Sequence, residues 1–302
     1  MDSAKTIKEI KLSNLQTSFS SHQVLANLFH EIHGFNGDIL LLNFRNVTFI
    51  SANQFSVLGC VISTFHAKHP EISIRVSNVS EKLKRIMRIN GFGRHLSYAS
   101  LPDINNTAIP YKIFDVTEIA EFEKYITISI FKREDLPQMS SGVRNQIIDN
   151  ILEIFNNVHE HTCSQHLFSC GQFFPKRKLL FFTITDAGET IPYNVKRYCQ
   201  KYNITLKNPD YLLSWALQSG NSTKSLDEPR GLGLYLLSEF IHLNNGELYI
   251  ISGNEVFEQN TAGERYMRLE CPFPGTIVTM AFNLSDHSSY CLSSELDTDS
   301  IF

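Results

Sequence analysis

The stretch GVRNQIIDNILEIFNNVHEH, residues 142–161, has the clearest helical pattern in the sequence. Its apolar side chains fall on one helical stripe: Val143, Ile147, Ile148, Ile151, Leu152 and Phe155. Two strand-like runs follow it, HLFSCGQFF and LLFFTITDAG. The chain continues with two helix candidates and then three strand candidates: DYLLSWALQSG, GLGLYLLSEFIHL, GELYIIS, RYMRLE and GTIVTMAF. This series predicts an α/β sandwich in the second half of the chain.

Two polar residues of this helix, Glu153 and Asn157, are the first candidates for chemistry. They are four residues apart, so they project from one face of the helix about one turn from each other. A carboxylate can accept a proton from attacking water, and an amide oxygen can bind Mg²⁺ that is shared with substrate phosphates. A solvated helix face would show the same pair, so these two residues alone do not define a site.

Asp186 and Gly188 follow the apolar run LLFFTIT. The carboxylate therefore lies where a buried strand ends, which is a usual place for ligand groups in α/β sheets. It can accept a hydrogen bond from the exocyclic amine of adenine, and Gly188 lets the backbone approach a planar base. An ordinary turn is the alternative, because Asp-x-Gly is common in turns.

Gly231-Leu232-Gly233 precedes a predicted helix. Free backbone N–H groups at a helix start suit phosphate oxygens, so this turn is a candidate phosphate cradle. Lys224 and Arg230 are nearby cations that can reach a phosphate, although a solvated loop charge is the commoner role for either one.

The order of these pieces resembles the GHKL superfamily of gyrase, heat-shock chaperone, histidine kinase and mismatch-repair ATPases. EIFNNVHEHT is similar to the N box, DAGETIP to the first glycine box and GLGLYLL to the second. The resemblance implies that Glu153 is a general base, Asn157 binds Mg²⁺, and Asp186 accepts from adenine with help from Thr276. It also implies that residues 219–230 are a mobile ATP lid. The first box departs from the family, because Thr190 stands where many members have a second glycine.

The first hundred residues alternate between strand and helix patterns. Residues Asp38–Ile50 predict two strand-like runs, DILLLNF and VTFI, and the helix QFSVLGCVISTFHAK follows. EISIRVS and EKLKRIMRING add a strand and a helix. With a first strand at Thr6–Leu12 and a helix near His22–His33, a small mixed α/β domain is expected.

DILLLNFRNVTFISANQFSVLG resembles the core of a STAS domain, the fold of anti-sigma-factor antagonists. Phosphorylatable antagonists carry Asp-Ser-Ser after the strand, and the aligned residues here are Ser51-Ala52-Asn53. The phosphoacceptor position is Ala52, which cannot be phosphorylated. We expect Ser51 to act as a helix N-cap, and a displaced phosphoacceptor at this serine is the alternative.

The whole chain is predicted to be α/β (α+β), with a STAS-like mixed sheet followed by a GHKL (Bergerat) sandwich. The expected parts are a STAS-like domain at 1–100, a connecting segment at 101–137, an ATP-binding domain at 138–284 and a flexible tail at 285–302. Pro102 and Pro110 suggest the connection, and the Ser- and Asp-rich composition suggests the tail.

The composition excludes several classes of protein. The charge of -4 comes from 27 basic and 31 acidic residues that are spread along the chain, so nucleic acid is not an expected partner. The sequence has neither a leader-like start nor an apolar run long enough to cross a membrane, which predicts a cytoplasmic protein. Six dispersed cysteines predict reduced thiols.

Three functions are compatible with these patterns. The first is an ATPase that uses ATP and Mg²⁺ to switch contacts with a protein partner, with another copy of itself or with its own STAS-like domain. The second is a serine or histidine protein kinase of the anti-sigma-factor type, for which no acceptor residue is evident. The third is a non-catalytic module that binds nucleotide as a structural ligand.

Overall fold

The computed structural model describes residues 5–161, 164–206, 210–221 and 233–295. The fold is mixed α/β, as predicted, with one parallel and one antiparallel main sheet. No helix within the described ranges is both long and apolar enough to cross a membrane. The five cysteines that can be described carry free thiols, and Cys163 lies outside the described residues.

The N-terminal unit contains a parallel three-stranded sheet in the order β1-β2-β3. Its elements are β1 (Ile7–Lys11), α1 (Phe19–His33), β2 (Ile39–Asn43), α2 (Gln54–Lys68), β3 (Ser73–Ser77), α3 (Glu81–Asn90) and the 3₁₀-helix η1 (Phe92–Leu96). Only β2 is a strand within the two runs predicted for Asp38–Ile50, because Ile50 forms just an isolated bridge with Leu15. Gly91 ends α3 with φ 88°, a left-handed conformation that favours glycine.

The second unit is built on an antiparallel five-stranded sheet in the order β4-β6-β7-β9-β8. Its strands are β4 (Ala108–Asp115), β6 (His166–Phe174), β7 (Leu179–Asp186), β8 (Glu247–Asn260) and β9 (Gly263–Asn283). Its helices are α4 (Ile119–Ile126), the π-helix η2 (Thr127–Phe131), α5 (Ser141–His161), α6 (Ile191–Tyr202), α7 (Leu212–Ala216) and α8 (Gly233–Leu243).

The segment 101–137, expected to be a connection, belongs to the second unit. It supplies β4, an edge strand of the five-stranded sheet, and it supplies α4 and η2. Pro110 suggested a linker, but it lies where the β4–β6 register shifts, between Ile109 and Lys112. An edge strand tolerates proline at such an irregularity, since no ladder hydrogen bond is needed there.

Part of the expected tail is also folded. β10 (Ser289–Tyr290) pairs with β5 (Gln138–Met139), and the 3₁₀-helix η3 (Ser293–Glu295) follows. The Glu295 carboxylate accepts hydrogen bonds from Ser140 Oγ at 2.5 Å and from the Gly142 N–H at 3.2 Å. A polar composition alone suggested a tail, whereas these bonds fix the segment to the start of α5.

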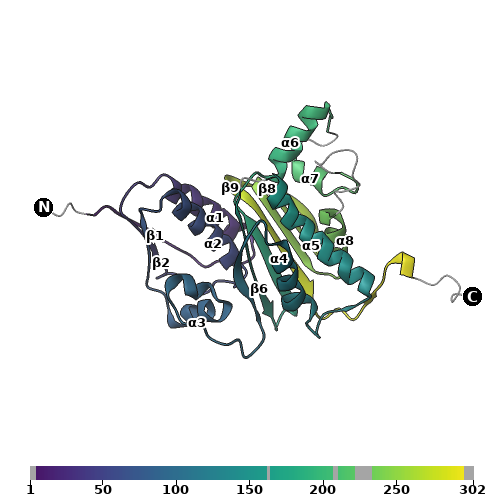
Figure 1. Cartoon of the computed structure of the whole chain (residues 1–302), viewed down its shortest axis with the longest axis horizontal. Coiled ribbons are helices and arrows are strands. Elements are labelled where there is room, and N and C mark those ends of the chain that lie inside the picture. The colour runs from purple at the N-terminus through teal and green to yellow at the C-terminus, as the bar shows by residue number, and fades with distance from the viewer. Residues whose placement is uncertain (1–4, 162–163, 207–209, 222–232, 296–302) are drawn as a thin grey trace, which may run out of the picture.

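Both faces of the five-stranded sheet are covered, as Figure 1 shows. One face packs against α4, α5 and α8, and its apolar side chains include Leu180, Phe182 and Ile184 of β7. The other face packs against α1 and α2, and one continuous apolar cluster joins it to the N-terminal unit. Every residue of β7 is consequently buried. We call these the α5 face and the α2 face of the sheet.

Candidate functional site

Three polar side chains form a row on the α5 face, at the end of the sheet. Asp186 closes β7 and pairs with Thr276 of β9, which pairs in turn with Ser252 of β8. Paired residues of adjacent strands point to the same face. The Ser252 and Thr276 hydroxyls lie 2.7 Å apart, and all three side chains are buried. We call this row the polar floor.

Asp186 is the member of the floor with unmet bonding capacity. Its Oδ1 atom is buried and has no hydrogen-bond partner among the described residues. Burial raises the pKa of this carboxyl from 3.8 to about 7, although the backbone N–H groups of Gly188 and Thr276 favour the charged form. A buried acceptor without a donor is costly, so a ligand amine or an ordered water at Oδ1 would relieve that cost.

Gly275 fixes the backbone beside Asp186. A Cβ atom at this position would lie 2.2 Å from the carbonyl oxygen of Asp186 and 2.7 Å from the Cα of Ala187. Only glycine permits such a close approach. The GT pair that the sequence placed before the final strand thus has two roles, because Gly275 sets the spacing and Thr276 supplies a hydroxyl to the floor.

The loop after Asp186 is tied down by the first turn of α6. Thr190 caps this helix, since its Oγ1 accepts from the Tyr193 N–H at 3.2 Å. The Ile191 N–H donates to Ser252 Oγ at 2.8 Å. Thr190 thus caps α6, while the bond from the Ile191 N–H to Ser252 anchors the loop on β8 and links it to the floor.

Glu153 and Asn157 are half-buried on α5. A Cβ atom added to Gly233 would lie 2.3 Å from Glu153 Oε2, so the carboxylate lies against the start of α8. A helix N-terminus attracts negative charge. The structure thereby brings Glu153 together with Gly233, and it brings Asp186 together with Gly188 and Thr276.

The fold directs these two groups toward one end of the sheet. α5 ends at His161, β6 begins at His166, and the next residue, Leu167, pairs with Asp186. The C-terminal end of α5, with Asn157 in its last turns, therefore lies at the same end of the sheet as the polar floor. Lys224, Arg230, Gly231 and Leu232 lie outside the described residues.

Two further polar residues were not predicted from the sequence. Ser252 ends the run GELYIIS, and its position before Gly253 was the available signal. Asn150 is buried on α5, three residues before Glu153 and seven before Asn157. This spacing places all three on one side of the helix. A polar residue next to the apolar stripe was the signal for Asn150.

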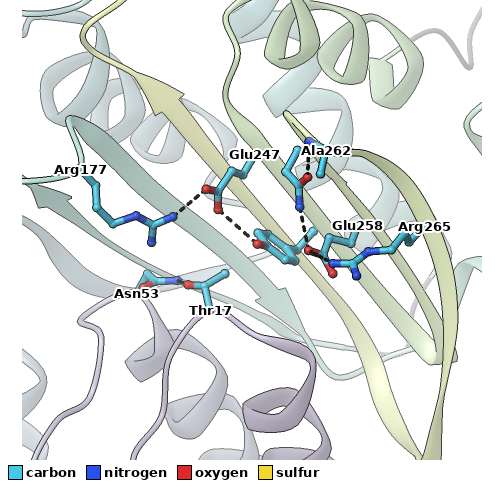
Figure 2. Close-up of polar contacts among 9 residues, drawn as sticks. Thr17, Asn53, Arg177, Glu247, Glu258, Ala262 and Arg265 are labelled. Atoms are coloured by element: carbon cyan, nitrogen blue, oxygen red, sulfur yellow. Dashed lines mark hydrogen bonds and ion pairs between the residues drawn. The ribbon is translucent and has the colours of Figure 1, made fainter.

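The loop before α2 faces the α2 face of the sheet, away from the polar floor. Ser51, Ala52 and Asn53 are all buried. The Ala52 N–H donates to Gln172 Oε1 at 2.7 Å, and Asn53 Nδ2 donates to Thr183 Oγ1 at 3.0 Å. Asn53 Nδ2 also donates to Thr17, as Figure 2 shows. The N-cap expected at Ser51 is wrong, because Asn53 occupies that position and makes no capping bond with its side chain.

Comparison of the chain with protein-family models, with curated proteins and with solved structures gives no match. The site is therefore interpreted from its own geometry.

Proposed function

We propose that the chain binds ATP with Mg²⁺ between the polar floor and the α5–α8 contact, and that it hydrolyses ATP to switch protein contacts. The observation that carries this proposal is the buried Oδ1 of Asp186, which no described residue contacts with a hydrogen bond, beside the Thr276 hydroxyl. An adenine ring offers an amine donor next to a ring nitrogen that accepts, which matches a carboxylate next to a hydroxyl.

The remaining groups suit the phosphate end of the nucleotide. The start of α8 at Gly233 presents backbone N–H groups to phosphate oxygens. Asn157 would bind Mg²⁺ through its amide oxygen, as hard cations prefer oxygen ligands. Glu153, which already lies at this helix start, would accept the proton of the attacking water. The resemblance to GHKL proteins implies the same roles for Asn157 and Glu153.

The three residues aligned with the phosphoacceptor motif, Ser51-Ala52-Asn53, offer no accessible hydroxyl for phosphoryl transfer. Ser51 is 4% exposed and Ala52 has no hydroxyl. Hydrolysis is therefore the proposed reaction, and transfer of phosphate to another protein is an outcome that the test distinguishes.

The test measures nucleotide binding, ADP release and protein-bound phosphate in one sample of the purified full chain with γ-labelled ATP. We expect saturable ATP binding, ADP release that requires Mg²⁺, and no label on the protein. Label on a protein would indicate that the reaction is phosphoryl transfer to protein and not hydrolysis. Binding without either reaction would leave a nucleotide-binding module, and no binding would refute the proposal.

Matched variants separate the roles of the residues. Glu153→Ala should keep ATP binding and lose hydrolysis, by a factor of about 10² or more, whereas Asp149→Ala, on an exposed position of the same helix, should change neither. Asp186→Asn should weaken ATP binding. Asp115→Asn is its control, because Asp115 also ends a strand of this sheet but is exposed. Unchanged hydrolysis in Glu153→Ala would exclude this residue as the base.

A further inference from the structure

The β8–β9 hairpin extends beyond the rest of the five-stranded sheet. β7 pairs with β9 over residues 276–283, whereas β8 and β9 continue to pair as far as Asn260 and Gly263. We call residues 253–273 the outer hairpin. It is stiffened by an ion pair between Glu258 and Arg265 at 2.8 Å, which Figure 2 shows.

A bulge separates the outer hairpin from the polar floor. The β8–β9 register shifts on both sides of Gly253, directly after Ser252. Gly253 has φ 62°, in the left-handed region that favours glycine. A bulge bends its strand and resets the alternation of side chains, so Glu255, Phe257 and Gln259 continue the face of Ser252. The polar floor is thus adjacent to the point where the outer hairpin bends.

One face of the outer hairpin packs against α1 of the N-terminal unit. Gln23 Oε1 accepts from the Glu270 N–H at 2.8 Å, and His30 Nε2 donates to the Pro272 carbonyl at 2.7 Å. The apolar residues Val256, Leu269 and Phe273 belong to the cluster that includes α1. The contact is therefore both polar and apolar along most of the helix.

The opposite face holds the segment that starts α7. The buried Glu255 accepts from the Leu213 N–H through Oε2 at 2.8 Å. The Arg268 guanidinium lies over the Tyr211 ring at 5.1 Å and donates to the Asp210 carbonyl. The Tyr211 and Tyr266 rings are 5.4 Å apart.

The same face also holds α8. Ser238 Oγ donates to Gln259 Oε1 at 3.1 Å, in a buried position. The first residue of α8, Gly233, lies against Glu153. The outer hairpin therefore contacts α1 on one side, and on the other it contacts both helices that flank residues 222–232.

We propose that the outer hairpin is a lever that couples α1 to α7 and α8, so that displacement of α1 changes the site around Glu153. Two packed faces on one stiff element transmit a shift of either neighbour to the other. The mechanical link stands on these contacts alone. Its effect on nucleotide affinity rests on the proposed function.

The chain contains a natural reporter for this coupling. Trp215 is the single tryptophan, it lies on α7, and its ring is 5.8 Å from that of Tyr198. Emission of Trp215 and exchange of the Leu213 amide proton can both be measured without nucleotide. The perturbation is Gln23→Ala, and the control is Glu31→Ala on the same helix, whose side chain contacts Lys8 of β1.

We expect Gln23→Ala to shift Trp215 emission and to speed exchange at Leu213 on the order of two- to tenfold, with no effect of Glu31→Ala. In a Glu255→Ala background the effect of Gln23→Ala should shrink, because one contact between the outer hairpin and α7 is removed while the contact between Arg268 and Tyr211 remains. Tyr211→Leu provides a second test if Glu255→Ala does not fold. The proposed coupling would be refuted if Gln23→Ala had no effect, or if its effect were the same with and without the substitution at Glu255 or Tyr211.

A nucleotide arm keeps this proposal distinct from the proposed function. If the protein binds ATP, Gln23→Ala should change the Kd on the order of two- to tenfold, and an unchanged Kd would overturn coupling to the site. If no ATP binds while the nucleotide-free readouts respond, the lever is supported and the proposed function fails.

Discussion

Replacing Asp186 by asparagine should make the stability of the protein depend less on pH. Burial raises the pKa of Asp186 to about 7 from 3.8, so the folded protein holds this proton more tightly than the unfolded chain. The stabilisation is complete below pH 3.8 and is lost as the pH rises through 7. Each pH unit in that window is worth about 1.4 kcal/mol, and wild type should therefore lose about 2–3 kcal/mol between pH 5 and 8 relative to the variant.

Comparison with the variant at each pH removes the contribution of other groups. Burial lowers the pKa of His22 to about 4, so its contribution to stability runs in the opposite direction and is lost as the pH falls below 6.5. His22 is unchanged in Asp186→Asn, and its contribution cancels in the difference. Urea denaturation at pH 5, 6.5 and 8, followed by Trp215 fluorescence, gives the two free energies of unfolding.

The same substitution should weaken ATP binding. The Gly188 and Thr276 N–H groups donate to an oxygen of the side chain, so they hold the amide oxygen of the asparagine beside them. The NH₂ group then faces the proposed position of the adenine amine. Two donors would meet there, and the hydrogen bond would be lost. The variant would then be more stable than wild type at pH 8 and less able to bind ATP. If the difference in free energy of unfolding between wild type and Asp186→Asn stays constant from pH 5 to 8, Asp186 is not a buried carboxyl group with a raised pKa.

Three other perturbations test separate parts of the structure. Gly275→Ala should lower the free energy of unfolding, measured by urea titration, by about 1–3 kcal/mol, because a Cβ atom has no space beside Asp186. Gly34→Ala is the control. A Cβ atom there would meet nothing within 4 Å, so this variant should change the free energy of unfolding little. Glu295→Ala should speed amide exchange in the first turn of α5, since the Gly142 N–H loses its acceptor; unchanged exchange there would exclude a role of Glu295 at the start of this helix. His22→Leu should remove the loss of stability between pH 6.5 and 4, measured by thermal unfolding across that range, because burial of the imidazole disfavours its charged form.

The parts of the site that the sequence predicted are those with strong local signals. The apolar stripe before Glu153 and the apolar run before Asp186 gave the correct helix and strand, because one element buries a stripe and the other is buried on both faces. Of the three residues of the polar floor, the sequence singled out Asp186 and Thr276 but not Ser252. Ser252 meets Thr276 through strand pairing between residues 24 positions apart, and such pairing leaves no local pattern.

The long hairpin escaped prediction for a different reason. GELYIIS and RYMRLE were expected as separate short strands, but β8 has 14 residues and β9 has 21. Buried polar residues such as Glu255 and Gln259 interrupt the apolar alternation, since their partners lie on α7 and α8. Periodicity detects burial against apolar neighbours, and it fails where a strand buries carboxylates and amides whose hydrogen-bond partners are distant in the sequence.

The contact between the two units bears on how the site itself works. α2 covers the far face of β7, and its buried residue Cys60 lies near enough for the Asp186 charge to raise the pKa of the Cys60 thiol further. The N-terminal unit therefore takes part in excluding water from the sheet that ends in Asp186. The Asp186 carboxyl lies on the opposite, α5 face, so loosening of α2 would not by itself bring water to this group. If Asp186 reads adenine as proposed, the outer hairpin is therefore the route by which the N-terminal unit would reach the site around Glu153.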